Sequence, residues 1–199
     1  MGPKDIYAQE KMNIEIVCFG QIESIVLDYL KNNLSEIFKA QVYPVRKRRP
    51  VRKDFSNGVY IGKTYDLPEY AYDKKRKQYL ASAILHNLSK SKDKNHKTLA
   101  IIDKDLYVPE LNFVFGLADP SRGACIISTA RLKQTYYGLP EDKDLFLRRT
   151  LKEAVHEIGH LLNLNHCPDP NCVMHFSNSL LDTDKKDYNF CDSCKNLLP

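Results

Sequence analysis

Residues 156–167, HEIGHLLNLNHC, constrain this chain more than any other stretch. They contain His156, His160 and His166, with Glu157 after the first histidine and a cysteine directly after the last. Histidines at positions i and i+4 of a helix lie one turn apart, so both imidazoles can bind one zinc ion at about 2.0–2.1 Å. A glutamate beside the first histidine has the geometry of a general base. The stretch therefore predicts a zinc site on a helix.

The apolar residues of this predicted helix lie opposite its histidines. On a helical wheel with His156 at 0°, His160 falls at roughly 40° and Glu157 at roughly 100°. The apolar residues fall between roughly 140° and 260°; they are Leu151, Ala154, Val155, Ile158, Leu161 and Leu162. We expect a helix from about residue 144 to 163, with Asp142 or Asp144 as its N-cap. It would bury the apolar face in the core and present the histidines on the other face.

His166 leaves the line of the other two histidines if the helix continues, because it would fall at roughly 280° on the wheel. The chain must turn after about residue 162 for His166 to reach the same metal ion. Such a turn usually needs a residue at positive φ, most often glycine and next asparagine. Asn163 stands at this place and is predicted to end the helix.

The stretch HEIGHLLNLNH resembles the long zinc motif of the metzincin metallopeptidases, H-E-x-x-H-x-x-G-x-x-H, with Asn163 in place of the glycine. The residues that follow read H-C-x4-C-x-M-x16-C-x2-C, and this combination is similar to the archaemetzincins of archaea and vertebrates. The resemblance extends over residues 156–194. Upstream of them only the general α/β layout matches.

The resemblance implies a role for each motif residue. His156, His160 and His166 would bind a catalytic zinc ion, and Glu157 would act as general base and acid. Met174 would lie in the tight turn beneath the zinc, the Met-turn, without binding it. A flexible core side chain is the alternative for Met174.

Four of the six cysteines lie in the last 33 residues, as a C-x4-C and a C-x2-C pair; they are Cys167, Cys172, Cys191 and Cys194. Four thiolates complete a tetrahedral zinc site, which favours a closed, structural metal. The archaemetzincins have a second zinc site of this kind, while two disulfides or free thiols are the alternatives. Cys18 and Cys125 lie in apolar runs and are predicted to be buried core residues.

The remaining pattern predicts an α+β (α/β-layered) fold with a mixed sheet. The resemblance implies that the sheet is metzincin-like and twisted, with an active-site helix and a small C-terminal subdomain stapled by zinc. Strands are expected at 13–20, 40–45, 97–107, 111–118 and 123–129, and helices at 21–38 and 71–90. The expected division is an N-terminal subdomain at 12–165 and a C-terminal subdomain at 166–199. By resemblance, a strand before the active-site helix pairs with the extended substrate. The segment 123–129 or a neighbouring one would serve.

The charge pattern argues against nucleic acid as a partner. The net charge of +5 is a mild basic excess. The run VRKRRPVRKD at 45–54 holds six basic residues, either as a patch for a partner or as a solvated loop. No apolar stretch approaches the roughly 20 residues that a bilayer span needs, and the start lacks a secretory signal. We therefore expect no membrane association, a cytoplasmic location and, with the oligomeric state undetermined, a monomer.

The main functional hypothesis is a zinc-dependent metallopeptidase that acts on peptides or proteins and holds two zinc ions per chain, one catalytic and one structural. The alternative is a catalytically weak or inactive zinc-binding protein that serves as a peptide- or partner-binding module. A nucleic-acid-binding zinc protein is a third hypothesis, which salt-dependent binding would test.

Overall fold

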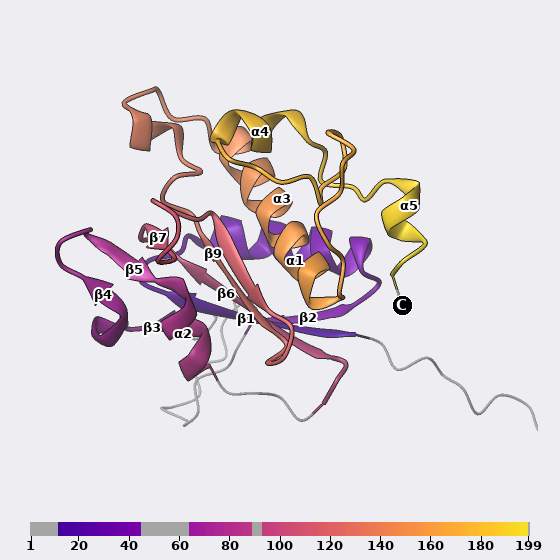
Figure 1. The fold of residues 1–199 in the computed structure, drawn as a ribbon, viewed down its shortest axis with the longest axis horizontal. Helices are drawn as coiled ribbons and strands as arrows, with labels where there is room; N and C mark the ends of the chain where they lie inside the picture. Colours follow the sequence, from indigo (N-terminus) through magenta and orange to yellow (C-terminus); the bar gives the residue numbers. More distant parts are fainter. Residues whose placement is uncertain (1–11, 45–63, 89–92, 199) are drawn as a thin grey trace, which may run out of the picture.

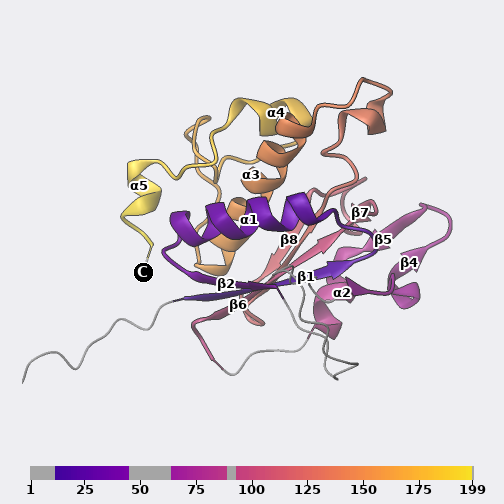
Figure 2. The ribbon, with the colours of Figure 1, turned by 180° about the vertical axis from the view of Figure 1, so that it is seen from behind.

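The computed structural model describes residues 12–44, 64–88 and 93–198, and the basic run at 45–54 lies outside them. A mixed sheet forms the centre of the molecule (Figures 1 and 2). Its strands are β1 (Asn13–Phe19), β2 (Gln41–Pro44), β3 (Thr64–Tyr65), β6 (His96–Ile102), β8 (Gly116–Asp119) and β9 (Ala124–Ser128). The order is β2-β1-β6-β9-β8, with β3 also paired to β1; β8 is antiparallel to β9 and the other pairs are parallel.

Alternate side chains of the central strands enter two separate hydrophobic clusters, as the pleat of a strand requires. In β6, Leu99 and Ile101 enter the cluster beneath α1 (Ser24–Ile37) and α3 (Lys143–Leu161). Ala100 and Ile102 enter the cluster beneath α2 (Ala81–Asn87) on the other face. The two long helices therefore cover one face of the sheet and the short helix covers the other (Figure 2). The predicted α+β fold with a mixed sheet is confirmed. Cys18 and Cys125 are buried, as expected.

The predicted helix at 71–90 is wrong in its first half. After the 3-10 turn η1 (Glu69–Ala71), the chain forms β4 (Tyr72–Asp73) and β5 (Gln78–Leu80), which join β7 (Leu106–Tyr107) in a second small sheet. A tight turn stops helix formation here. Lys77 adopts φ 58° and its N–H donates to the carbonyl of Asp73, whose carboxylate accepts from the N–H groups of Lys75 and Arg76. The helix starts only at Ala81.

Two strand predictions also need correction. The segment 97–107 divides into β6 and β7, and 111–118 is a strand only from Gly116 onward. A turn at Asp119–Gly123 joins β8 to β9, in which Arg122 N–H donates to Asp119 O and Gly123 N–H donates to Pro120 O. Because β9 lies between β6 and β8, the segment 123–129 is interior, and β8 is the edge strand of the sheet beside it.

Helix α3 begins and ends close to its predicted limits. The Asp142 carboxylate caps it by accepting from Leu145 N–H at 2.9 Å. The apolar face packs in the same cluster as the sheet and α1. The opposite face is also buried, with His156 only 5% exposed, because the segment after His166 and strand β8 cover it.

The C-terminal segment packs along α3 and carries two short helices, α4 (Leu180–Lys185) and α5 (Asp192–Lys195) (Figure 1). Its apolar residues Val173, Met174 and Phe190 belong to the same hydrophobic cluster as α3. The division into subdomains at 12–165 and 166–199 stays a prediction. A further 3-10 turn, η2 (Gln134–Tyr137), precedes α3. Of the helices in the described residues, none has the length and apolar character of a bilayer span.

Candidate functional site

The turn that follows α3 forms around Asn163. This residue adopts φ 65°, the left-handed conformation predicted for it. Leu164 N–H then donates to Gly159 O at 3.0 Å, which closes the helix end. The chain reverses at this point and returns His166 toward the helix.

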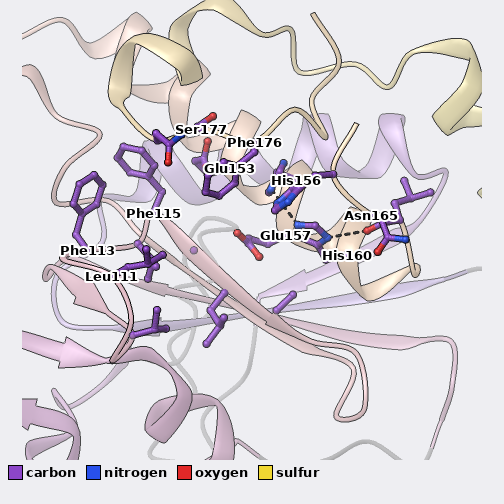
Figure 3. Close-up of a pocket in the computed structure, with 18 of the residues that line it drawn as sticks. Leu111, Phe113, Phe115, Glu153, His156, Glu157, His160, Asn165, Phe176 and Ser177 are labelled. Carbon is purple, nitrogen blue, oxygen red and sulfur yellow. Dashed lines mark hydrogen bonds between the residues drawn. The ribbon is translucent and has the colours of Figure 1, made fainter. Parts of the chain in front are cut away.

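The three histidines of the motif converge at one place. Figure 3 shows two of them, His156 and His160, side by side on α3. Their ring centroids are 4.7 Å apart for His156 and His160, 4.9 Å for His160 and His166, and 5.4 Å for His156 and His166. Each ring offers one nitrogen, and these three atoms lie within 4.8 Å of one another. His175, which follows the predicted Met-turn residue, contacts the carbonyl of Cys167 instead and does not join the group.

The hydrogen bonds of the rings indicate which nitrogens are free to bind a metal. His156 Nδ1 lies 2.8 Å from Val173 O, and His160 Nδ1 lies 2.8 Å from Leu164 O. A carbonyl only accepts, so both protons belong on Nδ1 and both Nε2 atoms carry a lone pair. These Nε2 atoms face each other at 3.1 Å.

Two lone pairs at this separation repel each other unless a cation lies between them. Burial lowers the pKa of His156 well below its ordinary value, so a proton is a poor candidate for that cation. Two nitrogens bound to one tetrahedral zinc at about 2.0–2.1 Å would lie roughly 3.3 Å apart. The donor set and its spacing therefore fit zinc.

Glu157 lies beside the histidines in a cleft between α3 and β8 (Figure 3). Glu157, the three histidines and residues of β8 line this cleft. The cleft has a volume of about 700 Å³. A Cβ at Gly116 of β8 would lie only 2.5–2.7 Å from three side-chain atoms of Glu157, so glycine is what allows this close approach. Burial, and after it the nearby Glu153 carboxylate, raise the pKa of Glu157 well above its ordinary value.

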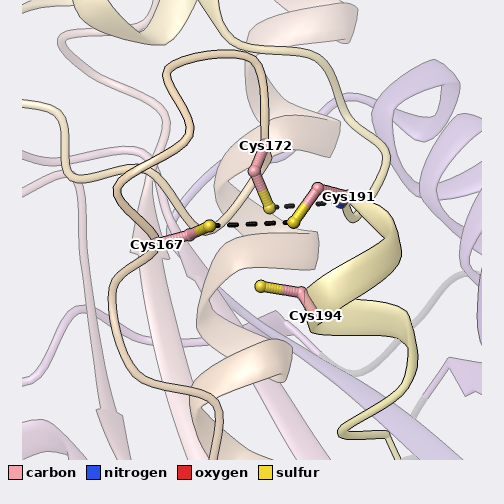
Figure 4. Close-up of side chains that lie close together, drawn as sticks. All are labelled: Cys167, Cys172, Cys191 and Cys194. Atoms are coloured by element: carbon pink, nitrogen blue, oxygen red, sulfur yellow. Dashed lines mark hydrogen bonds between the residues drawn. The ribbon is translucent and has the colours of Figure 1, made fainter.

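The four C-terminal cysteines form a second cluster, shown in Figure 4. Their sulfur atoms lie within 4.8 Å of one another, and Cys167 Sγ is 3.7 Å from Cys191 Sγ. None of the four forms a disulfide, so the disulfide alternative is not what the structure contains. Sulfurs bound to one tetrahedral zinc at about 2.3 Å would lie roughly 3.8 Å apart. This cluster also fits zinc.

Short backbone contacts connect the two clusters. Cys167 N–H donates to Met174 O at 2.9 Å, and His175 Nδ1 lies 3.0 Å from Cys167 O. Met174 is fully buried and lies against Gly159 of the helix. The adjacent residues His166 and Cys167 therefore belong to different clusters.

Several residues that line the cleft were not predicted from the sequence. Glu153 falls at roughly 60° on the helical wheel, between His160 and Glu157. This position could have predicted that Glu153 lies in the same cleft as the histidines. Lys186 and Ser177 line the cleft from the C-terminal segment, where neither periodicity nor motif indicates them. Gly116 likewise shows its role only once β8 is placed beside α3.

A helix carrying His-Glu-x-x-His beside the edge strand of a mixed sheet, with a third histidine after the helix, defines a zinc metallopeptidase of the metzincin type. Residues 10–199 match Peptidase family M54, and the chain belongs to this family. It is 42% identical to an archaemetzincin of Pyrococcus abyssi over 183 residues, 91% of each chain. It is 38% identical to one of Methanocaldococcus jannaschii, over 92% of this chain and 90% of the relative.

Solved structures give the same result. The crystal structure of the Methanopyrus kandleri archaemetzincin superimposes with a TM-score of 0.76 at 38% identity, covering 96% of each chain. The Archaeoglobus fulgidus archaemetzincin, solved with malonate, gives a TM-score of 0.75 at 34% identity, covering 94% of this chain and all of that one. The chain is accordingly a zinc metallopeptidase, whose substrates are peptides.

Proposed function

We propose that this chain hydrolyses peptide bonds at a zinc ion held by His156, His160 and His166, with Glu157 as general base and acid. The observation that carries the proposal is the pair of Nε2 atoms facing each other at 3.1 Å, with both Nδ1 atoms bound to carbonyl oxygens. Glu157 lies in the same cleft, one residue beyond His156. The open cleft distinguishes this cluster from the closed cysteine cluster.

A bound zinc ion would supply a Lewis acid that makes water nucleophilic near neutral pH and polarises the scissile carbonyl. Glu157 takes the proton from the attacking water on its carboxylate and then gives it to the leaving amine nitrogen. The raised pKa of its buried carboxyl group favours holding this proton between the two steps. His156 and His160 are fixed by their Nδ1 hydrogen bonds, which keep Nε2 directed into the cleft.

We further propose that Cys167, Cys172, Cys191 and Cys194 hold a second, structural zinc ion. Cys172 and Cys194 are buried, and Cys191 N–H donates to Cys172 Sγ at 3.3 Å. An amide donor to a sulfur stabilises the thiolate that zinc requires. The four sulfurs leave no position for water or substrate, so this metal would have no part in the chemistry.

Strand β8 would hold the substrate. As the edge strand it presents one side of its backbone to the cleft, and Gly116, Leu117 and Ala118 line that cleft together with α3. An extended peptide can add to such an edge through main-chain hydrogen bonds. Its scissile bond would then lie next to the histidines and Glu157.

The test is a peptide-library assay of the wild type and Glu157→Ala, with zinc content measured on both. We expect cleavage by the wild type, a loss of at least about 100-fold in the variant and equal zinc content. Glu157→Asp is the matched control, because aspartate keeps the negative charge but has a shorter side chain. This variant should retain partial activity. Equal cleavage by wild type and Glu157→Ala would contradict the role of Glu157. No cleavage by the wild type would favour the alternative of a peptide-binding module.

A further inference from the structure

The cleft contains a second charged group beside the zinc-binding motif. Glu153, one turn before Glu157, forms an ion pair with Lys186 at 3.2 Å, and their side chains are 4% and 0% exposed. Thr183 Oγ1 donates to the same oxygen, Glu153 Oε1, at 3.2 Å. Lys186 Nζ also lies 3.4 Å from His175 O. The pair is thus buried, and its charges compensate each other.

These contacts involve only one carboxylate oxygen of Glu153, Oε1, and leave the other, Oε2, for a further contact. Within the described residues Oε2 has no hydrogen-bond partner, and Glu153 lines the cleft. Ser177 also lines the cleft, and its buried hydroxyl has no hydrogen-bond partner among the residues that the structure describes. A buried polar group without a partner, such as the Ser177 hydroxyl, is unfavourable unless a ligand or water satisfies it. Glu153 Oε2 is not among the fully enclosed atoms without a partner in the described residues, so it is open to the cleft. Glu153 therefore offers an acceptor to a group that enters the cleft.

The walls around this acceptor are aromatic (Figure 3). Phe113 and Phe115 form an edge-to-face pair with ring centroids 5.2 Å apart, and the Phe176 ring lies tilted against the His166 ring with centroids 4.8 Å apart. The guanidinium of Arg131 lies 4.1 Å from the Phe113 ring and is itself held by Asp105 through two hydrogen bonds of 2.7 Å. These contacts keep the apolar walls in place before a substrate binds.

We infer that this recess binds a substrate side chain with an aromatic body and a hydroxyl group as hydrogen-bond donor at its tip, which among the amino acids is tyrosine. The phenol would donate to Glu153 Oε2 while its ring packs between the phenylalanines. Because Lys186 already compensates Glu153, a cationic side chain gains little there, and an acidic one would face the oxygen directly. The inference rests on the proposed function and adds the class of substrate.

The first experiment compares peptide pools that differ only in holding tyrosine, phenylalanine, lysine or glutamate at one position. We expect the wild type to prefer tyrosine to phenylalanine by at least about tenfold in kcat/KM, since the acceptor is left unpaired by phenylalanine. Lysine and glutamate should be less favourable than either. A tyrosine-to-phenylalanine ratio near one would overturn the inference.

The second experiment changes the charge of the recess. Lys186→Met leaves the Glu153 carboxylate without its counter-charge, so the preference should shift toward lysine, with the lysine-to-tyrosine ratio rising about tenfold. Replacing both residues, as Glu153→Leu with Lys186→Met, should bring the tyrosine-to-phenylalanine ratio to about one. Lys185→Met is the matched control, because Lys185 is the adjacent, exposed lysine. A purely structural role would lower the hydrolysis of all pools alike and leave these ratios unchanged, which would contradict the inference.

Binding separates this inference from the proposed function. The same four pools can be titrated against Glu157→Ala, which retains the recess but not the proposed base. Preferential binding of the tyrosine pool supports the recess even if no peptide is ever cleaved. Cleavage by the wild type without any preference for tyrosine, in binding or in kcat/KM, would remove the recess and leave the proposed function standing.

Discussion

Met174 occupies the space beside Gly159 that any side chain at that position would need. A Cβ on Gly159 would overlap Met174 Sδ and lie 3.1 Å from Met174 Cε. Gly159 is the residue before His160, and Val173, the neighbour of Met174, accepts the hydrogen bond from His156. The contact therefore joins the helix that carries two histidines to the turn that orients one of them.

Gly159→Ala should accordingly disturb both stability and metal binding. Forcing one extra methyl group into a packed core typically costs about 1–3 kcal/mol, and here the displaced group is Met174. We expect a lower midpoint in chemical denaturation and weaker zinc binding. Adding Met174→Ala makes room for the methyl group, so the double variant should lose less stability than the sum of the two single variants. Strict additivity would show that the contact does not matter.

Asn163 gives a direct test of the helix end. Its φ of 65° is accessible to glycine without strain but costs other residues about 1–2 kcal/mol. Asn163→Gly should therefore keep the stability of the wild type, and Asn163→Ala should lose about 1 kcal/mol. Thermal unfolding of the two variants side by side measures the difference. Equal loss in both would indicate that the asparagine side chain, and not the backbone conformation, is what matters.

Gly116→Ala tests the close approach of β8 to Glu157. The added Cβ would lie 2.5 Å from Glu157 Oε1, so the carboxylate must move. We expect kcat to fall by about 10- to 100-fold while zinc content stays at the wild-type level. Activity assays with metal analysis check this. A variant with wild-type kcat would mean that the carboxylate has room to shift without effect.

The two metal clusters should be coupled through the adjacent residues His166 and Cys167. Cys191→Ser removes one proposed structural ligand and should lower peptidase activity, although it touches none of the three histidines. Cys18→Ala is the matched control, since Cys18 is a buried thiol in β1 outside both clusters, and it should retain the wild-type zinc content. Unchanged zinc content and activity in Cys191→Ser would contradict the coupling.

The residues of the two candidate metal clusters were predictable because their geometry is local. His156 and His160 are fixed by one helical turn, Asn163 marks the end of that helix, and a dense cysteine pattern indicates the second cluster. The hairpin formed by β4 and β5 was missed because Lys77 adopts a positive φ that the sequence does not indicate.

The cleft beyond the histidines was not predictable in the same way. Its contacts join residues far apart in the chain, Gly116 with Glu157 and Glu153 with Lys186. Neither member of such a pair reveals its partner through spacing or periodicity. The fold must first place β8 and the segment after α4 against the helix.

Metal content tests the central claim most directly. Purified wild-type protein should contain two zinc ions per chain, and His160→Ala should contain one, because it removes a ligand of the histidine cluster and leaves the four cysteines intact. Elemental analysis by mass spectrometry gives both numbers. One zinc ion or none in the wild type, or two in His160→Ala, would contradict the account.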